Sequence, residues 1–232
     1  MLKAPDDTIL SPMPVSGKYA LFYLVLILLS VSAAAGAGPP IDITFRGDEI
    51  GKPPQGWGAR NGDPGQVYIV QSEEGKKYLH AAADGVSVAI GYEKAWPLGE
   101  YPVLQWQWRA VTFPSNSDER KKSGSDSALG LYVVFGRWPF IKSIKYIWSD
   151  TLPEGETFNS PFASSTKEVV VRSGRAQAGM WITERRDVLA DYRRLFGENK
   201  SPVARGIAIL TDSDNTHSRA VGDYGFIKTL PQ

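Results

Sequence analysis

Short runs of alternating apolar and polar residues recur along most of this chain, with turn residues between them. Between residues 103 and 111, every second side chain is apolar and most of the others are polar. A period of two with one apolar face is typical of a half-buried antiparallel strand. We therefore expect Trp106 and Trp108 to lie in a core. The opposite, polar face of this run carries Gln105, Gln107 and Arg109.

Many such runs, separated by Gly-, Pro- and Asn-rich turns, predict an all-β sandwich or barrel. Residues 129–135 and 207–210 are apolar on both faces, which is typical of central strands covered on both sides. The runs predict strands near residues 41–46, 66–71, 78–83, 86–91, 103–111, 128–136, 144–149, 167–173, 179–185, 206–212 and 223–229.

One segment has the pattern of a helix. From Asp187 to Phe196, Val188, Tyr192 and Leu195 form an apolar stripe. Asp187 is a suitable N-cap, and Gly197 suits the position after the last helical residue. The polar, turn-rich stretch 115–126 predicts a mobile loop between two long strands.

The N-terminal segment has the pattern of a secretory signal peptide. An uncharged apolar run, 19–31, precedes the small residues of 32–38, and an apolar run of roughly 7–15 residues before such a site is the usual arrangement. We expect residues 1–35 to be removed, with 36–232 forming a single domain. An uncleaved anchor is the alternative. Asp6 and Asp7 do not suit a signal n-region, so we infer translation from Met13.

Composition excludes several kinds of site. The formal net charge is +1 and there is no cysteine, while histidine occurs only at positions 80 and 217. A nucleic-acid-binding domain is usually strongly basic, so nucleic acid is not an expected partner. A disulfide framework, a thiolate metal site and a cysteine nucleophile are excluded. No G-x-S-x-G motif marks a serine nucleophile.

Several segments together resemble the bacterial family known as domain of unknown function 3047. They include Trp106-Gln-Trp-Arg109, the stretch Gly179-Met-Trp-Ile-Thr-Glu-Arg-Arg-Asp-Val188 and the stretch Thr211-Asp-Ser-Asp-Asn-Thr216. The likeness extends over roughly residues 41–229. It implies an exported bacterial protein with a lectin-like jelly roll, and it implies no reaction. Gly225-Phe226 stands where the family pattern has Asp-Ile, so a carboxylate of the family is missing there.

Oxygen-bearing side chains are concentrated in the segment 212–216. Asp212, Asp214 and Asn215 are candidate ligands for Ca²⁺, which prefers six to eight oxygen ligands. The segment is no EF-hand, because His217 replaces the required glycine and strands flank it. The alternative is a turn whose Asp and Asn side chains accept bonds from backbone N–H groups. Ca²⁺ is the one cofactor that the sequence suggests.

Charged residues at the end of the 179–185 strand form a second candidate site. Glu184 falls on the apolar face of that strand and needs a partner, for which Arg172 is the candidate. Such a pair is either structural or part of a ligand cleft. Glu184 is also the candidate for a catalytic carboxylate, with Glu119 and Asp126 as alternatives. The expected ligand-binding residues are Arg137, Trp138, Asp126, Glu184 and Arg186.

The tryptophans fall into two groups. Trp106, Trp108 and Trp148 alternate with polar residues, so we expect them in the core. Those in loop contexts are candidates for stacking on sugar rings, with packing under loops as the alternative. This second group contains Trp57, Trp96 and Trp138.

These observations favour a non-catalytic envelope protein that binds a carbohydrate or another polar ligand. The expected fold is an antiparallel β-sandwich of the lectin-like jelly-roll type with one short helix. A polysaccharide hydrolase and a structural or partner-binding envelope protein are the alternatives. We expect the protein to be periplasmic or secreted, to meet a glycan or another envelope component, and to contact the membrane only transiently through its signal peptide.

Overall fold

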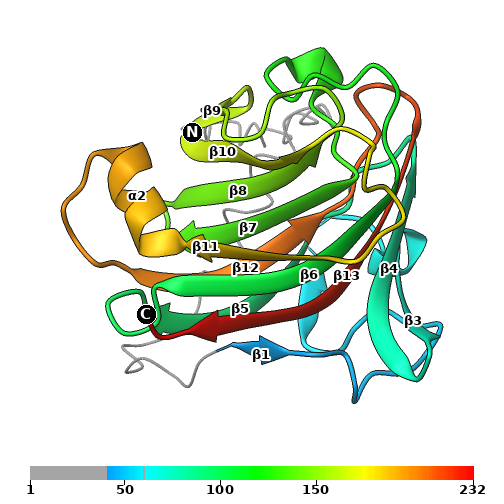
Figure 1. The fold of residues 1–232 in the computed structure, drawn as a ribbon, viewed down its shortest axis with the longest axis horizontal. Coiled ribbons are helices and arrows are strands. Elements are labelled where there is room, and N and C mark those ends of the chain that lie inside the picture. The colour runs from blue at the N-terminus through cyan, green and yellow to red at the C-terminus, as the bar shows by residue number, and fades with distance from the viewer. Residues whose placement is uncertain (1–40, 60) are drawn as a thin grey trace, which may run out of the picture.

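The protein is an antiparallel β-sandwich of two large sheets, and the described residues contain a single α-helix, which lies at one end (Figure 1). The structure, a computed structural model, describes residues 41–59 and 61–232. The predicted signal peptide, 1–35, and the inferred start at Met13 lie outside the described residues. In the described part of the chain, no helix is long and apolar enough to cross a membrane.

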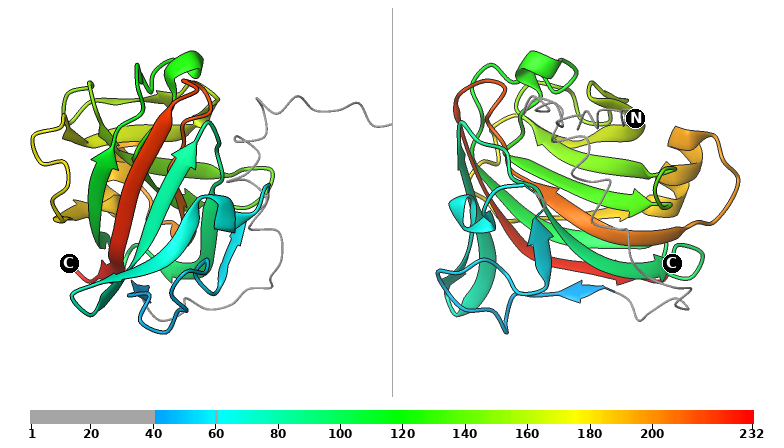
Figure 2. Two further views of the ribbon diagram at one scale, coloured as in Figure 1. Left: turned by 90° about the vertical axis from the view of Figure 1, so that its right-hand side faces the viewer. Right: turned by 180° about the vertical axis from the view of Figure 1, so that it is seen from behind.

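The six-stranded sheet places β6 and β13 at its centre. Viewed from the side, β13, β4 and β3 lie next to one another (Figure 2). The order is β11 (Ile182–Asp187), β6 (Val103–Thr112), β13 (Arg219–Leu230), β4 (Lys76–Asp84) and β3 (Tyr68–Glu73), with β1 (Asp42–Ile43) paired to β13.

The seven-stranded sheet contains the strands that are apolar on both faces. Its order is β2 (Trp57–Ala59), β5 (Ile90–Pro97), β12 (Val203–Leu210), β7 (Leu129–Phe135), β8 (Lys142–Ser149), β10 (Ala163–Ser173) and β9 (Thr157–Ser160). Every residue of β7 is buried, as its sequence indicated.

The strand predictions fail in three places. The run predicted at 86–91 is shifted, because β5 occupies Ile90–Pro97. The short strands β2 and β9 were not predicted. The pairing of β8 with β10 is parallel rather than antiparallel, because the intervening β9 turns back on β10 and reverses the chain once more.

Aromatic side chains join the two sheets across the core. Trp106 on β6 stacks on Tyr146 of β8, with ring centroids 5.4 Å apart, and Trp108 approaches Trp148 at 6.3 Å. All four side chains are fully buried. Rings of this size dominate the energetics of a core. The prediction that Trp106, Trp108 and Trp148 are core residues is confirmed.

The helix α2 (Val188–Phe196) closes one end of the sandwich (Figure 1). The Asp187 carboxylate accepts from the N–H of Ala190 at 2.8 Å, and Gly197 ends the helix in the left-handed conformation at φ 66°. Both predicted caps are confirmed. Tyr192 packs edge-on against Phe135 of β7, with centroids 4.9 Å apart.

The loop between β6 and β7 is packed against the protein. A short 3-10 turn, η3 (Lys122–Gly124), lies within it. Glu119 accepts from the Ser149 hydroxyl at 2.9 Å, and the Asp118 N–H donates to the carbonyl of Gly124 at 2.9 Å. Its polar composition did not reveal that Ser117, Glu119, Ser125 and Asp126 are buried.

Candidate ligand-binding groove

A groove of about 560 Å³ lies on the outer face of the six-stranded sheet. It crosses the sheet at the polar face predicted for residues 103–111, and Gln107 lies on its floor. The remaining wall comes from the β3–β4 hairpin, the chain after β1, Trp181 just before β11, and Gly225 and Phe226 of β13. Its lining includes Thr44, Glu73, Tyr78, Gln107, Trp181 and Phe226.

Two aromatic rings and a guanidinium form a platform in this region. The rings of Tyr78 and Trp181 meet edge to face with centroids 5.4 Å apart. The Arg109 guanidinium lies 4.5 Å from the Trp181 centroid and 5.4 Å from that of Tyr78. A cation within about 6 Å of a ring centroid is attracted to the ring face. The three side chains therefore hold one another in place.

Carboxylates fix the position of the Arg109 side chain. Its Nε donates to Oδ2 of Asp223 at 2.7 Å and its Nη1 to Oε2 of Glu73 at 3.0 Å. The same Glu73 oxygen accepts from Nε1 of Trp181 at 3.2 Å. The other oxygen of Asp223 lies 2.7 Å from Nδ1 of His80. Arg109 is thus held by two carboxylates, whereas Arg46, Lys76 and Lys77, which also line the groove, form no ion pair with a described residue.

The Tyr78 hydroxyl is kept protonated. Burial, followed by the nearby Asp223 carboxylate, raises the pKa of Tyr78 above its usual value. The hydroxyl donates to Oε1 of Gln71 at 2.9 Å. Tyr78 therefore contributes a neutral, hydrogen-bonded side chain to the groove lining.

Gly225 leaves room for the side chain of Gln107. A Cβ at Gly225 would lie 2.9 Å from Oε1 and 3.2 Å from Cβ of Gln107. The β13–β6 register shifts between Tyr224 and Ile227, so Gly225 and Phe226 form a bulge at the groove. Bulges often occur beside functional sites, where they redirect a side chain.

The predicted ligand-binding residues do not meet in one place. Asp126 precedes β7, whereas Arg137 and Trp138 follow it, so they lie at opposite ends of a strand about 23 Å long. Trp138 is 57% exposed. Arg186 contacts Asp191 of α2 through bonds of 2.9 to 3.1 Å and so attaches the helix.

Glu184 lies between the sheets and away from the groove. Its carboxylate accepts from Arg172 at 2.7 and 3.3 Å and from Nε1 of Trp108 at 3.3 Å. The predicted Arg172–Glu184 pair is confirmed. Since Glu184 is 8% exposed, this geometry favours the structural interpretation of the pair.

The other two loop tryptophans are packing residues. Trp96 lies in β5 opposite Ala204 and is fully buried, so its prediction as a loop residue is wrong. Trp57 on β2 is half-buried between Phe45 and Tyr92, with centroids at 6.4 and 5.6 Å. Trp181, which sequence reasoning did not select, is the tryptophan that lines the groove.

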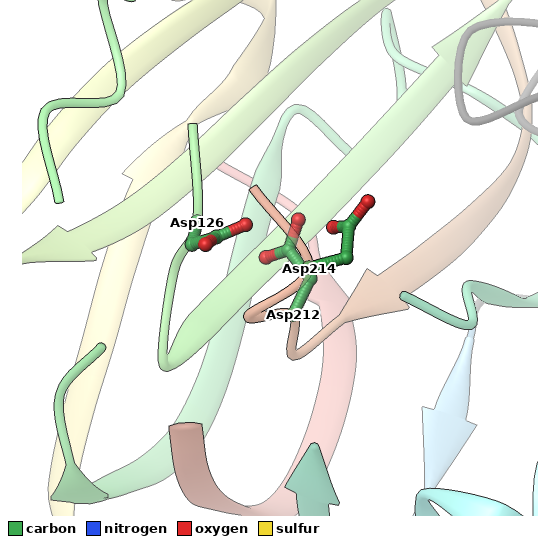
Figure 3. A group of neighbouring side chains, drawn as sticks. All are labelled: Asp126, Asp212 and Asp214. Carbon is green, nitrogen blue, oxygen red and sulfur yellow. The ribbon is translucent and has the colours of Figure 1, made fainter. Parts of the chain in front are cut away.

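The candidate metal ligands Asp212 and Asp214 lie near Asp126, at the end of the other sheet (Figure 3). One oxygen from each of the three residues lies within 4.8 Å of the others. Asn215 directs its Nδ2 to Asp126 at 3.0 Å and to Asp214 at 3.2 Å, so in this arrangement it donates to the carboxylates.

A family model described as "Protein of unknown function (DUF3047)" matches residues 55–228. The chain belongs to this family. No curated protein matches it. The family description assigns no activity, so the membership confirms the resemblance without adding a function.

Solved structures with a similar fold share little sequence with the chain. The Emp47p carbohydrate recognition domain has a TM-score of 0.46 at 10% identity, over 87% of this chain and 99% of its own. A carbohydrate-binding module of the β-sandwich superfamily has 0.36 at 12%, over 75% and 57%. The family 11 xylanase of Neocallimastix patriciarum has 0.33 at 8%, over 82% and 96%. At such identities, what these proteins bind does not transfer to this chain.

Proposed function

We propose that this protein is a non-catalytic binding module whose groove on the six-stranded sheet takes a carbohydrate. The observation that carries the proposal is the Tyr78–Arg109–Trp181 platform beside the groove. Aromatic surfaces pack against the C–H faces of sugar rings, while amide and guanidinium groups bond to sugar hydroxyls. A volume of about 560 Å³ is within the range of small-molecule sites, roughly 300–1,000 Å³.

The charges at the platform are already paired with one another. Arg109 already contacts two carboxylates, and Asp223 is 2% exposed between Arg109 and His80. A charged ligand would have to displace one of these pairs. Gln107 makes no hydrogen bond to another described side chain, so its amide is free to bond to a hydroxyl.

The geometry gives no support to a hydrolase that uses Glu184. Glycoside hydrolysis needs two carboxylates that flank the scissile bond. Glu184 faces the core tryptophans and is held by Arg172, and the groove carboxylates Glu73 and Asp223 are held by Arg109. Turnover of a polysaccharide that survives Glu184→Gln unchanged would be the direct refutation of that alternative.

A pull-down with insoluble polysaccharides tests the proposal. Wild-type protein is mixed with cellulose, chitin, xylan or peptidoglycan sacculi, and the bound fraction is measured. We expect retention on at least one of them, with a loss of about tenfold in affinity for Trp181→Ala, which corresponds to the upper range of what aromatic packing contributes. Trp138→Ala is the matched control, because Trp138 is exposed far from the groove, and it should bind like wild type.

Absence of binding to all four polymers would contradict the proposal for these polysaccharides. Equal binding by Trp181→Ala and wild type would contradict the choice of site.

We further propose export to the periplasm or the medium, supported by the apolar segment 19–31. Cell fractionation that finds the protein in the cytoplasm would refute this.

A further inference from the structure

Three carboxylates from two distant segments meet at one end of the seven-stranded sheet. Asp126 precedes β7, while Asp212 and Asp214 follow β12. Since β7 and β12 are antiparallel, with Gly130 opposite Leu210, the start of one strand lies beside the end of the other. Figure 3 shows the three carboxylates together, and we call this group the acidic turn.

Asp126 is the carboxylate that shapes the acidic turn. Its Oδ1 accepts from the N–H of Asn215 at 3.2 Å and from its Nδ2 at 3.0 Å. Its Oδ2 accepts from the N–H of Thr216 at 2.7 Å and from its hydroxyl at 2.6 Å. Asp126, from the loop before β7, therefore holds Asn215 and Thr216 in place, whereas the turn interpretation assigned such bonds to the side chains of the segment 212–216 itself.

Asp212 has a buried oxygen without a partner. The side chain is 0% exposed. Its Oδ1 accepts from the N–H of Ser127 at 2.9 Å, but its Oδ2 accepts no hydrogen bond from any described residue. The Ser127 hydroxyl, 1% exposed and next to Asp126 in the chain, also lacks a partner. A buried carboxylate oxygen left unpaired is costly, so this atom indicates a missing ligand.

The negative charge of the acidic turn is not balanced within the described part of the chain. Lys145, the cation whose charge acts on Asp212, lies 3.4 Å from Glu168 in a buried ion pair. None of the three aspartates lies within ion-pair distance of a described cation. By contrast, Glu168 and Lys145 are 1% and 3% exposed and neutralise each other.

We propose that Asp212 and Asp214, with the neighbouring Asp126, bind one hard divalent cation of the size of Ca²⁺. Hard cations prefer oxygen ligands, and oxygens on opposite sides of Ca²⁺ lie about 4.6 to 5.2 Å apart, twice its usual ligand distance. The carboxylate oxygens lie within 4.8 Å of one another, inside that limit. Asp214 is half-buried, so the ion can enter from its side.

A cation here joins two parts of the chain that are far apart in sequence. The loop before β7 and the turn after β12 then share one ion in addition to the bonds of Asp126. The site is on the sheet opposite to the groove, so cation binding and carbohydrate binding can succeed or fail separately.

Calorimetric titration of the chelator-treated full chain with Ca²⁺, and separately with Mg²⁺, tests this inference. We expect one Ca²⁺ per chain, weaker Mg²⁺ binding, and a rise in melting temperature with Ca²⁺ that chelator reverses. Asp212→Asn should weaken Ca²⁺ binding by about tenfold or more, because affinity depends on the number of charged ligands. Asp42→Asn, which changes an exposed carboxylate on β1, should bind like wild type.

Asp214→Asn keeps the test decisive if Asp212→Asn does not fold, since Asp214 is only half-buried. We expect it to fold, as checked by circular dichroism, and to bind Ca²⁺ about tenfold more weakly or worse. A wild-type titration with no heat beyond dilution would overturn the proposal. Unchanged affinity in a folded Asp214→Asn would also overturn it, and so would Mg²⁺ binding as tightly as Ca²⁺.

Discussion

The groove and the acidic turn differ in how their charged side chains are paired. In the groove, Arg109 lies between Asp223 and Glu73, and His80 contacts the remaining Asp223 oxygen. In the acidic turn, three carboxylates approach one another with a buried oxygen unpaired. Both regions contain polar side chains at the end or on the face of a sheet, yet only beside the groove does each of these carboxylates contact a guanidinium or an imidazole among the described residues.

This difference predicts what each region takes from solution. An aromatic surface whose nearby carboxylates are paired gains by stacking and by hydrogen bonds to hydroxyls, so it suits a sugar. An unbalanced cluster of buried oxygens gains most from a cation, since burial of uncompensated charge is costly. Substitutions that remove or restore a charge partner or a packing contact therefore distinguish the groove from the acidic turn.

The largest effect is expected from Lys145→Met. Lys145 is the buried partner of Glu168, and it also interacts electrostatically with the nearby Asp212 and Glu119. Removing one member of a buried pair leaves the other uncompensated, which costs about 3–5 kcal/mol in the free energy of unfolding. Urea denaturation measures it. The double variant Lys145→Met, Glu168→Leu should recover most of the loss, and a double variant as unstable as the single one would contradict the account.

Glu119→Gln should make stability less dependent on pH. Burial raises the pKa of Glu119 from 4.5 to about 7. Because the folded-state value is the higher one, the contribution of Glu119 is full below about pH 4.5 and is lost as the pH rises through 7. The variant should equal wild type near pH 4 and exceed it at pH 8 by up to about 3 kcal/mol. Parallel stability curves for the two proteins would contradict this.

Gly225→Val adds atoms to the groove rather than removing them. The new side chain collides with Gln107 and pushes it into the groove, which leaves less space for a ligand. Overpacking of this kind costs about 1–3 kcal/mol. We expect a comparable loss in binding to whichever polysaccharide retains the wild type, about tenfold, with Ca²⁺ affinity unchanged. Full polysaccharide binding would place the ligand elsewhere.

Glu73→Gln should have the smallest effect. Glu73 is 49% exposed and Arg109 keeps its bond to Asp223, so the loss in stability is expected at about 0.2–1 kcal/mol. Polysaccharide binding should fall less than in Trp181→Ala, because the rings remain. A thermal melt measures the loss in stability, and the same pull-down measures the loss in binding. A loss as large as that of Trp181→Ala would show that the charge of Glu73, rather than the platform, dominates.

Local patterns predicted much of the fold. The alternation in 103–111 identified the core tryptophans and the polar face that becomes the groove floor. Asp187 and Gly197 marked both ends of the helix. Trp96 was missed as a core residue because the following Pro97 suggested a loop, whereas that proline ends β5.

The candidate sites depended on strand order, which a single sequence does not reveal. Tyr78, Arg109, Trp181 and Asp223 come together because β4, β13, β6 and β11 are neighbours, although these strands are far apart in the chain. Alternation around 179–185 did place Trp181 opposite Glu184, but pairing with β6 decides which face is inside. Asp126 was assigned to a different site from Asp212 for the same reason, since β7 and β12 bring them together.

The chemical shifts of the tryptophan indole N–H groups test the central claim most directly. The chain has seven tryptophans, and only Trp181 lines the groove in the described residues. A soluble fragment of the retained polysaccharide is titrated into labelled protein. The account predicts that the Trp181 signal moves and saturates while that of exposed Trp138 stays in place. A saturating shift of Trp138 with an unmoved Trp181 would contradict it.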